Sequence, residues 1–317
     1  MAYKMIIVGM IATPIGRSAA ASRNMLPAFV RAPTSTTNIV PISRGCLSSV
    51  AGAPAGSCDS GKDGEGGSKL NSVMSTPWAM VETKRKGRKN KSRFRQHVNP
   101  LARRFQMETE LPEAWPKGTF DDPTKPLHLD IGCGKGGFLL DLATKRLSDG
   151  HDHTNYIGLE IRPNVVQHAK GRIPRWNLTG HMDFIGCNAN VDLRRLLNLY
   201  EGSEGQLETV SIQFPDPHFK ASHAKRRVVT PELVTTLAEF LTAGKEVFIQ
   251  SDVLDLFNDM RERFREESGY FTDTVEDFND YLPDNPIGVP TEREVSVLVQ
   301  NLPVYRTVFR RTDKAVE

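Results

Sequence analysis

The chain has 317 residues, 38% of them hydrophobic and 25% charged, which is enough for one large domain with a buried core and for accessory segments. No apolar run reaches the ~18 residues that a membrane-spanning helix needs, so we expect no membrane-embedded part. The formal net charge of +3 is a sum of opposed segments: +5 over residues 1–58, −2 over 59–83, +10 over 84–107 and −10 over 108–317.

Residues 1–58 contain five basic residues and no acidic residue, and they are rich in Ala, Ser, Thr and Pro. Such a composition without sustained periodicity is typical of an organelle-targeting leader. An apolar run over 5–15, followed by a transit-like stretch near 27–29, favours import into a plastid. The alternatives are a mitochondrial destination and an ordinary disordered leader on a cytoplasmic or nuclear protein. Residues 59–83 continue as a flexible linker.

Basic residues gather in 84–107, which hold ten Lys or Arg and no acidic residue. The run KRKGRKNKSRFR at 84–95 places eight cations in twelve positions with one aromatic residue. Such a run can be a solvated tail or a nuclear-localisation-like signal. Because it precedes a body with a net charge of −10, we interpret it as an arm that binds the phosphates of RNA.

From residue 108 onward we expect a single catalytic domain. Short apolar runs typical of buried strands lie at 127–131, 156–159, 182–185, 209–214 and 246–250, and helical periodicity fills the gaps, most clearly at 136–146, 231–241 and 254–267. This alternation predicts an α/β fold with a parallel sheet covered on both faces and a ligand site at the carboxyl ends of the strands. No Cys-x-x-Cys pair occurs among Cys46, Cys58, Cys133 and Cys187, so we expect free thiols and no metal site.

A glycine-rich turn, DIGCGKGG at 130–137, joins the first strand to the first helix. Gly132 and Gly134 allow the backbone to approach a ligand closely, as in dinucleotide-binding proteins. Asp130 would repel a pyrophosphate there but attract an ammonium group, and Glu160 at the end of the next strand can accept hydrogen bonds from ribose hydroxyls. An ammonium-bearing nucleoside without phosphates describes S-adenosylmethionine. The sequence therefore predicts a class I methyltransferase in preference to a dinucleotide enzyme.

After the third strand, the sequence CNAN at 187–190 is placed where an amide could contact the adenine of that cofactor. Asn188 has a second interpretation, as a turn residue that caps the next helix.

The fourth strand ends in QFPDPHFK at 213–220, and the cation-rich ASHAKRR follows. Two prolines fix the backbone around Asp216 at the carboxyl edge of the sheet. A rigid carboxylate followed by cations indicates a site that handles an anionic polymer.

These motifs together resemble one family. LDIGCGKGG, GLEIR, FPDPHFK followed by KRR, and GVPTERE at 288–294 have the order seen in the tRNA (guanine-N7)-methyltransferases. RFRQHVNPL at 93–101 is similar to the segment before the domain in plastid and cyanobacterial members. The resemblance covers about residues 93–311. It implies a Rossmann-like fold with a mostly parallel seven-stranded sheet, S-adenosylmethionine as cofactor, and methylation of N7 of guanosine 46 in the variable loop of tRNA.

The resemblance also implies residue roles. The cofactor site is formed by Asp130, Gly132, Gly134, Glu160, Arg162, Asn188 and Ala189. Asp216 corresponds to the acid named as catalytic. The substrate-binding residues are Lys220, Ser222, His223, Lys225, Arg226, Arg227, Asp252, Thr291 and Glu294. Two of these have structural alternatives: Thr291 could form a capping box with Glu294, and Asp252 could cap the helix that begins near Leu254.

Two other functions stay open on the residues alone. A non-catalytic RNA-binding subunit could keep the methyltransferase fold, although the intact Asp130, Glu160 and Asp216 argue against it. An amino-group methyltransferase would be expected to carry Asn/Asp-Pro-Pro-Tyr in place of FPDPHFK. Eukaryotic cytosolic relatives work with a WD-repeat partner. KRR and GVPTERE resemble the corresponding motifs of bacterial and plastid members. We therefore expect an enzyme that acts on tRNA without an obligate protein partner, as a monomer or homodimer.

Overall fold

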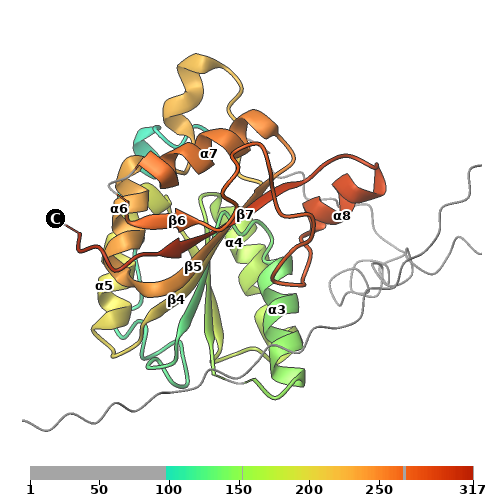
Figure 1. Ribbon diagram of the computed structural model, residues 1–317. Coiled ribbons are helices and arrows are strands. Elements are labelled where there is room, and N and C mark those ends of the chain that lie inside the picture. The colour runs from blue at the N-terminus through green and yellow to red at the C-terminus, as the bar shows by residue number, and fades with distance from the viewer. Residues whose placement is uncertain (1–97, 152, 267–268, 317) are drawn as a thin grey trace, which may run out of the picture. The chain divides into compact units, whose positions relative to one another are not determined.

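The computed structural model describes residues 98–316 except 152 and 267–268, so the predicted leader, the linker and residues 84–97 of the basic arm lie outside the described residues. Seven strands of the described part form one sheet in the order β3-β2-β1-β4-β5-β7-β6 (Figure 1). The strands are β1 (Leu127–Ile131), β2 (Asn155–Glu160), β3 (Met182–Gly186), β4 (Leu207–Gln213), β5 (Leu241–Ser251), β6 (Phe271–Asp273) and β7 (Tyr305–Arg311). The first five are parallel, and β7 is antiparallel to both β5 and β6. The predicted mostly parallel seven-stranded sheet is confirmed.

Helices cover both faces of this sheet, as the pattern of strands and helices predicts. One face carries α3 (Gly137–Ser148) and α4 (Pro163–Lys170), and the other carries α5 (Ala189–Glu201), α6 (Pro231–Phe240) and α7 (Leu254–Glu266). Tyr156 of β2 belongs to the core under α3, whereas its neighbour Ile157 belongs to the core under α5. Successive side chains of a strand point to opposite faces, and one buried strand therefore serves two cores.

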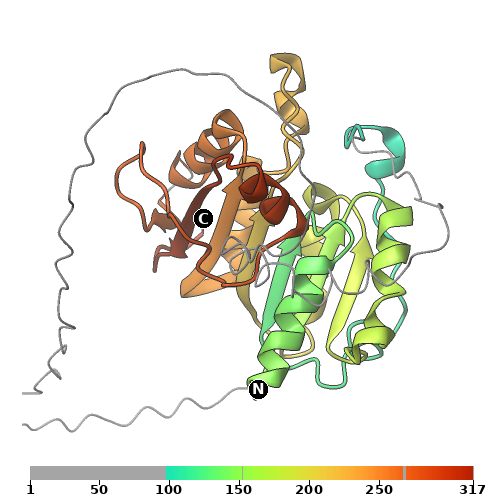
Figure 2. The same cartoon turned by 90° about the vertical axis from the view of Figure 1, so that its right-hand side faces the viewer.

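Three 3-10 helices and one more α-helix complete the described part: η1 (Arg103–Phe105), η2 (Ile173–Trp176), η3 (Ala221–Arg226) and α8 (Glu292–Val299). Figures 1 and 2 show the segment that contains η3, in gold, projecting beyond the carboxyl ends of the parallel strands. In Figure 1, α8 lies on the same side of the sheet as α3, and an ion pair between Lys135 and Glu292 (3.2 Å) links the two regions. Every described helix is too short or too polar to cross a lipid bilayer.

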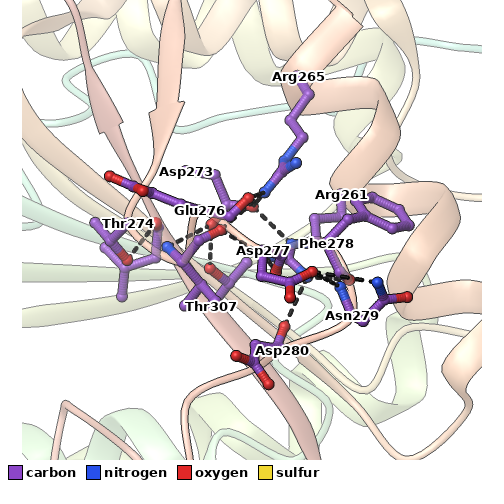
Figure 3. Close-up of polar contacts among 12 residues, drawn as sticks. Arg261, Arg265, Asp273, Thr274, Glu276, Asp277, Phe278, Asn279, Asp280 and Thr307 are labelled. Atoms are coloured by element: carbon purple, nitrogen blue, oxygen red, sulfur yellow. Dashed lines mark hydrogen bonds and ion pairs between the residues drawn. The ribbon is translucent and has the colours of Figure 1, made fainter.

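A buried arginine organises the irregular chain between β6 and α8 (Figure 3). Arg261 of α7 has no exposed surface, and its Nε donates to Asp273 Oδ2 at 2.6 Å. Its two terminal nitrogens donate to backbone carbonyls of the loop after β6, those of Val275, Asp277, Phe278 and Asp280. Arg265 also pairs with Asp273 at 2.8 Å. A buried guanidinium is stable only when its donors are satisfied, and here the loop carbonyls satisfy them.

The carboxyl ends of the parallel strands bring the predicted site residues to one edge of the sheet. Asp130 lies in β1, Glu160 ends β2, Asn188 follows β3 and Asp252 follows β5. Asp216 lies in the turn after β4, which is the central strand of the sheet. In parallel α/β sheets this edge is the usual place for a ligand.

Candidate functional site

The glycine turn after β1 leaves open space where side chains would otherwise lie. Gly132 and Gly134 have φ values of +85° and +54°, and a Cβ added at either would meet nothing within 4 Å. Gly136 differs, because a Cβ there would lie 2.3 Å from the ring of Phe184. The first two glycines therefore form an open cradle, whereas the third permits close packing of α3 on the sheet.

Asp130 is a buried carboxylate beside this turn, only 3% exposed. Its Oδ1 accepts hydrogen bonds from Ser211 Oγ at 2.8 Å and from Gln213 Nε2 at 3.4 Å. Burial raises the pKa of Asp130 to about 7, although these two hydrogen bonds act in the opposite direction. Within residues 98–316 no cation forms an ion pair with this carboxylate, so a positively charged ligand group would be stabilised there.

Glu160 at the end of β2 is held by Arg162. The guanidinium donates from Nε to Oε1 and from a terminal nitrogen to Oε2, both at 2.9 Å, and the backbone N–H of Arg162 also donates to Oε1. These bonds to Glu160 raise the pKa of Arg162, and the charge of Asp216 adds to the effect. Asp216, the catalytic candidate, and Glu160, the ribose-binding candidate, thus both stabilise the charged form of the Arg162 guanidinium.

Asn188 is the N-cap of α5, since its Oδ1 accepts from the backbone N–H of Asn190 at 3.2 Å. The structural alternative for Asn188 is therefore confirmed. Its Nδ2 donates to the carbonyls of Phe105 (3.1 Å) and Pro100 (3.4 Å). Residues 98–109, which we call the covering segment, thereby lie over the carboxyl end of β3. Thr109 fixes the end of this segment through its backbone N–H to Asp192 and its hydroxyl to the carbonyl of Gly186.

The turn that carries Asp216 has an unusual backbone. Phe214 and His218 both adopt left-handed conformations, with φ values of 49° and 45°, which non-glycine residues rarely do. Arg227 braces the turn, because its Nε donates to the carbonyl of Pro217 at 3.2 Å while its terminal nitrogen pairs with Asp259 of α7 at 3.0 Å. Strained backbone that is held in place by its surroundings is typical of functional sites.

Two cavities meet at this turn. The first cavity, about 330 Å³, lies over the ends of β2 and β3 and is partly walled by Val98 of the covering segment. The second cavity, about 660 Å³, extends from the glycine turn to Asp252 and the start of α8. The residues that line both are Gly132, Arg162, Phe214, Pro215 and Asp216. Asp216 therefore lies on the boundary between two chambers, each within the size range of ligand sites.

Most of the predicted site residues line one of these cavities. The predicted residues that line the first cavity are Glu160, Asn188, Ala189, Lys225, Arg226 and Arg227. The second receives Asp130, Gly134, Asp252 and Thr291. Gly132, Arg162 and Asp216 line both. Four predicted residues line neither cavity: Lys220, Ser222, His223 and Glu294.

The motif at the start of α8 has a clear structural role. Thr291 and Glu294 form a capping box, with the backbone N–H of Glu294 donating to Thr291 Oγ1 at 3.0 Å. Glu294 is 2% exposed, and its carboxylate accepts from Arg306 at 2.8 Å, from Asn285 at 2.9 Å and from Gln250 at 3.1 Å. The predicted capping alternative for Thr291 is confirmed. Glu294 lines neither cavity, and its bond to Thr291 fixes that residue at the wall of the second.

Asp252 does not have the capping role that was its structural alternative. Its carboxylate pairs with Arg293 of α8, and the side-chain hydrogen bond before α7 comes from Ser251, whose Oγ accepts from the N–H of Val253 at 3.0 Å. Asp252 was a poor candidate for the cap because the helix begins at Leu254, two residues further on. The pair between Asp252 and Arg293 instead joins β5 to α8 across the second cavity.

The described part of the chain is similar to known proteins. A family model described as "Putative methyltransferase" matches residues 124–307. The tRNA (guanine-N(7)-)-methyltransferase of Synechococcus elongatus is 48% identical over 219 residues, which cover 69% of this chain and 96% of that protein. The enzyme of the same name from Thermosynechococcus vestitus is 46% identical, over 69% of this chain and 95% of its own length. The chain belongs to the tRNA (guanine-N7)-methyltransferase family.

The methyl donor of the tRNA (guanine-N7)-methyltransferases is S-adenosylmethionine, and the first cavity together with the glycine-turn end of the second fits it. Its ammonium group would supply the cation that buried Asp130 lacks, and the open space at Gly132 and Gly134 would receive the amino-acid part. Glu160 would bind the ribose hydroxyls. A carboxylate accepts about four hydrogen bonds and Arg162 already supplies three, so the ribose has to share Glu160 with Arg162 or displace it.

The sequence analysis did not predict two features of the candidate site. The contact of the covering segment with Asn188 joins residues more than 80 positions apart, and no local pattern indicates such a contact. Phe219 lines the second cavity but was not among the predicted site residues. Its signal was present, because an aromatic residue stands between the proline-rich turn and the cation-rich stretch that ends at Arg227.

Proposed function

We propose that this protein transfers the methyl group of S-adenosylmethionine to N7 of guanosine 46 in tRNA. The observation that supports this most directly is the place of Asp216 on the boundary of the two cavities. The cofactor residues lie around the first cavity and the glycine turn. The second cavity leads from there to Asp252 and Thr291, which provides a chamber for an incoming guanine base.

The chemistry requires orientation more than proton transfer. N7 of guanine is an in-plane lone pair with no proton to lose, so no general base is needed before the attack. When bound, S-adenosylmethionine supplies an electrophilic methyl group on a sulfonium. Asp216 would orient the base by accepting hydrogen bonds from its N1–H and exocyclic amine, and its charge would stabilise the positive charge that develops on the purine. The rigid turn around Asp216 holds the carboxylate ready for this role.

The contact with RNA would come from cations of the projecting segment, three of which line the first cavity, and from the basic arm. Lys220 and Lys225 are exposed on the projecting segment, and Arg226 and Arg227 lie beside them. Residues 84–107 add ten positive charges to a body that carries −10. Each phosphate that these groups neutralise contributes a slope of about −0.7 to −0.9 in log K against log salt.

The decisive experiment is nucleoside mass spectrometry of tRNA after incubation with purified protein (residues 59–317) and isotope-labelled S-adenosylmethionine. We expect labelled 7-methylguanosine in tRNA with guanosine at position 46 and none in a transcript with adenosine there. Equal labelling of both transcripts would contradict the assignment of position 46. Absence of 7-methylguanosine from every tRNA would contradict the proposed function.

We further propose that the enzyme acts without an obligate protein partner and in a plastid. The acid-free composition of residues 1–58 supports the second proposal. Activity of the purified chain alone tests the first. Fusion of residues 1–58 to a fluorescent protein tests the second, and the fluorescent protein without these residues is the control. Plastid fluorescence is expected only with the leader, whereas mitochondrial or nuclear fluorescence would contradict this location.

A further inference from the structure

Phe219 is the most exposed large hydrophobic side chain within residues 98–316, at 76%. It lies on the connection between β4 and η3, in the gold segment that projects beyond the strand ends in Figures 1 and 2. Such a ring contributes little to the stability of the folded chain, because most of its surface stays in water. Single exposed apolar residues are common on proteins, so exposure alone gives Phe219 no role.

The location of Phe219 distinguishes it from the other exposed apolar residues. Phe219 lines the second cavity together with Asp216 and Thr291. The preceding residue, His218, has the left-handed φ of 45° that only a minority of non-glycine residues adopt. The backbone therefore presents the ring at the rim of the reaction chamber at a conformational cost, which is expected where function fixes the geometry.

The surroundings of the ring are cationic. Lys220 follows directly and is exposed, and Lys225 is exposed on the same projecting segment. Desolvation holds the pKa of His223 below its ordinary value, and the charges of Arg226 and Lys220 lower it further. An aromatic ring among exposed cations is the arrangement by which proteins bind unpaired nucleotides, because bases stack on the ring while the cations contact phosphates.

We propose that Phe219 is a stacking platform for an unpaired base of the RNA at the rim of the second cavity. A guanosine that enters the cavity loses its stacking partners in the RNA loop, and stacking on the ring of Phe219 would replace part of that loss. Lys220 and Lys225 would hold the adjoining phosphates. This inference rests on the proposed function, since it assigns a residue that positions the RNA for the same reaction.

The test compares Phe219→Ala and Phe219→Trp with the wild type. Affinity for tRNA is measured by fluorescence anisotropy in the presence of S-adenosylhomocysteine, and KM and kcat are measured with S-adenosylmethionine. Phe219→Ala should weaken tRNA binding about 10-fold or more, because stacking of a base contributes strongly to single-strand binding. Phe219→Trp should restore it. The salt slope and the affinity for S-adenosylmethionine should stay unchanged, because no phosphate or cofactor contact is lost.

The matched control is Leu302→Ala, which removes an exposed apolar side chain (49%) outside both cavities and should bind tRNA as the wild type does. A direct readout is the fluorescence of 2-aminopurine in place of the target guanosine, which the wild type should quench more strongly than Phe219→Ala does. Wild-type tRNA affinity in Phe219→Ala, or equal weakening in the Ala and Trp variants, would overturn the stacking proposal.

The failure of this inference can be told apart from failure of the proposed function. If the wild type methylates tRNA and Phe219→Ala binds tRNA equally well, stacking is wrong and the proposed function stands. If the wild type forms no 7-methylguanosine, the proposed function is wrong. The binding and quenching measurements do not depend on methyl transfer, so they still decide whether Phe219 stacks on RNA.

Discussion

Asp216 is the residue on which the proposed chemistry depends most. We expect Asp216→Asn to lower kcat by about 10²–10³-fold, since it removes the charge that would stabilise the cationic purine and alters the acceptors that would orient the base. The affinity for S-adenosylmethionine, measured by calorimetry, should change by only severalfold, because the proposed cofactor contacts come from Asp130 and Glu160. Near-normal turnover in this variant would contradict the catalytic assignment.

Asp130 should make cofactor binding depend on pH. Its pKa of about 7 in the free protein means that it is protonated below neutrality, whereas the ammonium group of the cofactor favours the ionised form. Binding then releases a proton, so the affinity for S-adenosylmethionine should rise as pH increases from 5.5 to 7, by up to about 10-fold per unit, and level off above.

Calorimetry in two buffers with different ionisation enthalpies would detect the proton that Asp130 releases. Asp130→Asn is the control for this pH dependence. It should bind the cofactor more weakly but with a flat profile over this range. An equally steep profile in that variant would show that another group titrates.

The candidate cofactor residues were predictable because each lies close to the carboxyl end of a strand. Asp130, Glu160 and Asp216 are carboxylates at one edge of a parallel sheet, and the sheet itself could be inferred from apolar runs. The sequence could not indicate that Arg162 binds both oxygens of Glu160, because a surface arginine and a paired arginine look alike in a sequence. The sequence also could not indicate that the Glu294 side chain is buried.

At the scale of elements, the connection from β6 to α8 depends on one buried side chain. Arg261→Met would remove the hydrogen bonds to four loop carbonyls and the pair with Asp273. We expect a loss of about 3–5 kcal/mol in the free energy of unfolding, measured by urea denaturation, because buried partners would be left unsatisfied. Arg263→Met, at a partly exposed position of the same helix, should cost less than about 1 kcal/mol. Equal losses in both variants would contradict this role.

Strands β1 to β5 and helices α3, α6 and α7 were predictable from the sequence, whereas β7 was not. Its sequence YRTVFRR places arginines at positions that are buried in the sheet, Arg306 and Arg311. Buried arginines break the apolar pattern by which a central strand is identified. They are accommodated because Arg306 pairs with Glu294 and Arg311 donates to the carbonyl of Ala238, and both partners come from distant elements.

For the whole molecule, the opposed charges predict how RNA binding responds to salt. Replacement of residues 84–95 by a Gly/Ser sequence of equal length removes eight cations while keeping the chain length. We expect weaker tRNA binding and a shallower slope of log K against log salt, measured between 50 and about 200 mM salt by anisotropy. The same affinity and slope as the wild type would show that this run does not contact RNA.

The covering segment also limits how far the basic arm can reach. Val98 is fixed at the wall of the first cavity, and the fourteen residues 84–97 that precede it span at most about 50 Å whatever conformation they adopt. An RNA held by these residues is therefore tethered to the reaction chamber, at an effective concentration of about millimolar order. If the proposed arm binds tRNA, capture by the arm and entry of the guanosine would be steps within one complex, and we would expect the arm to affect tRNA binding more than kcat.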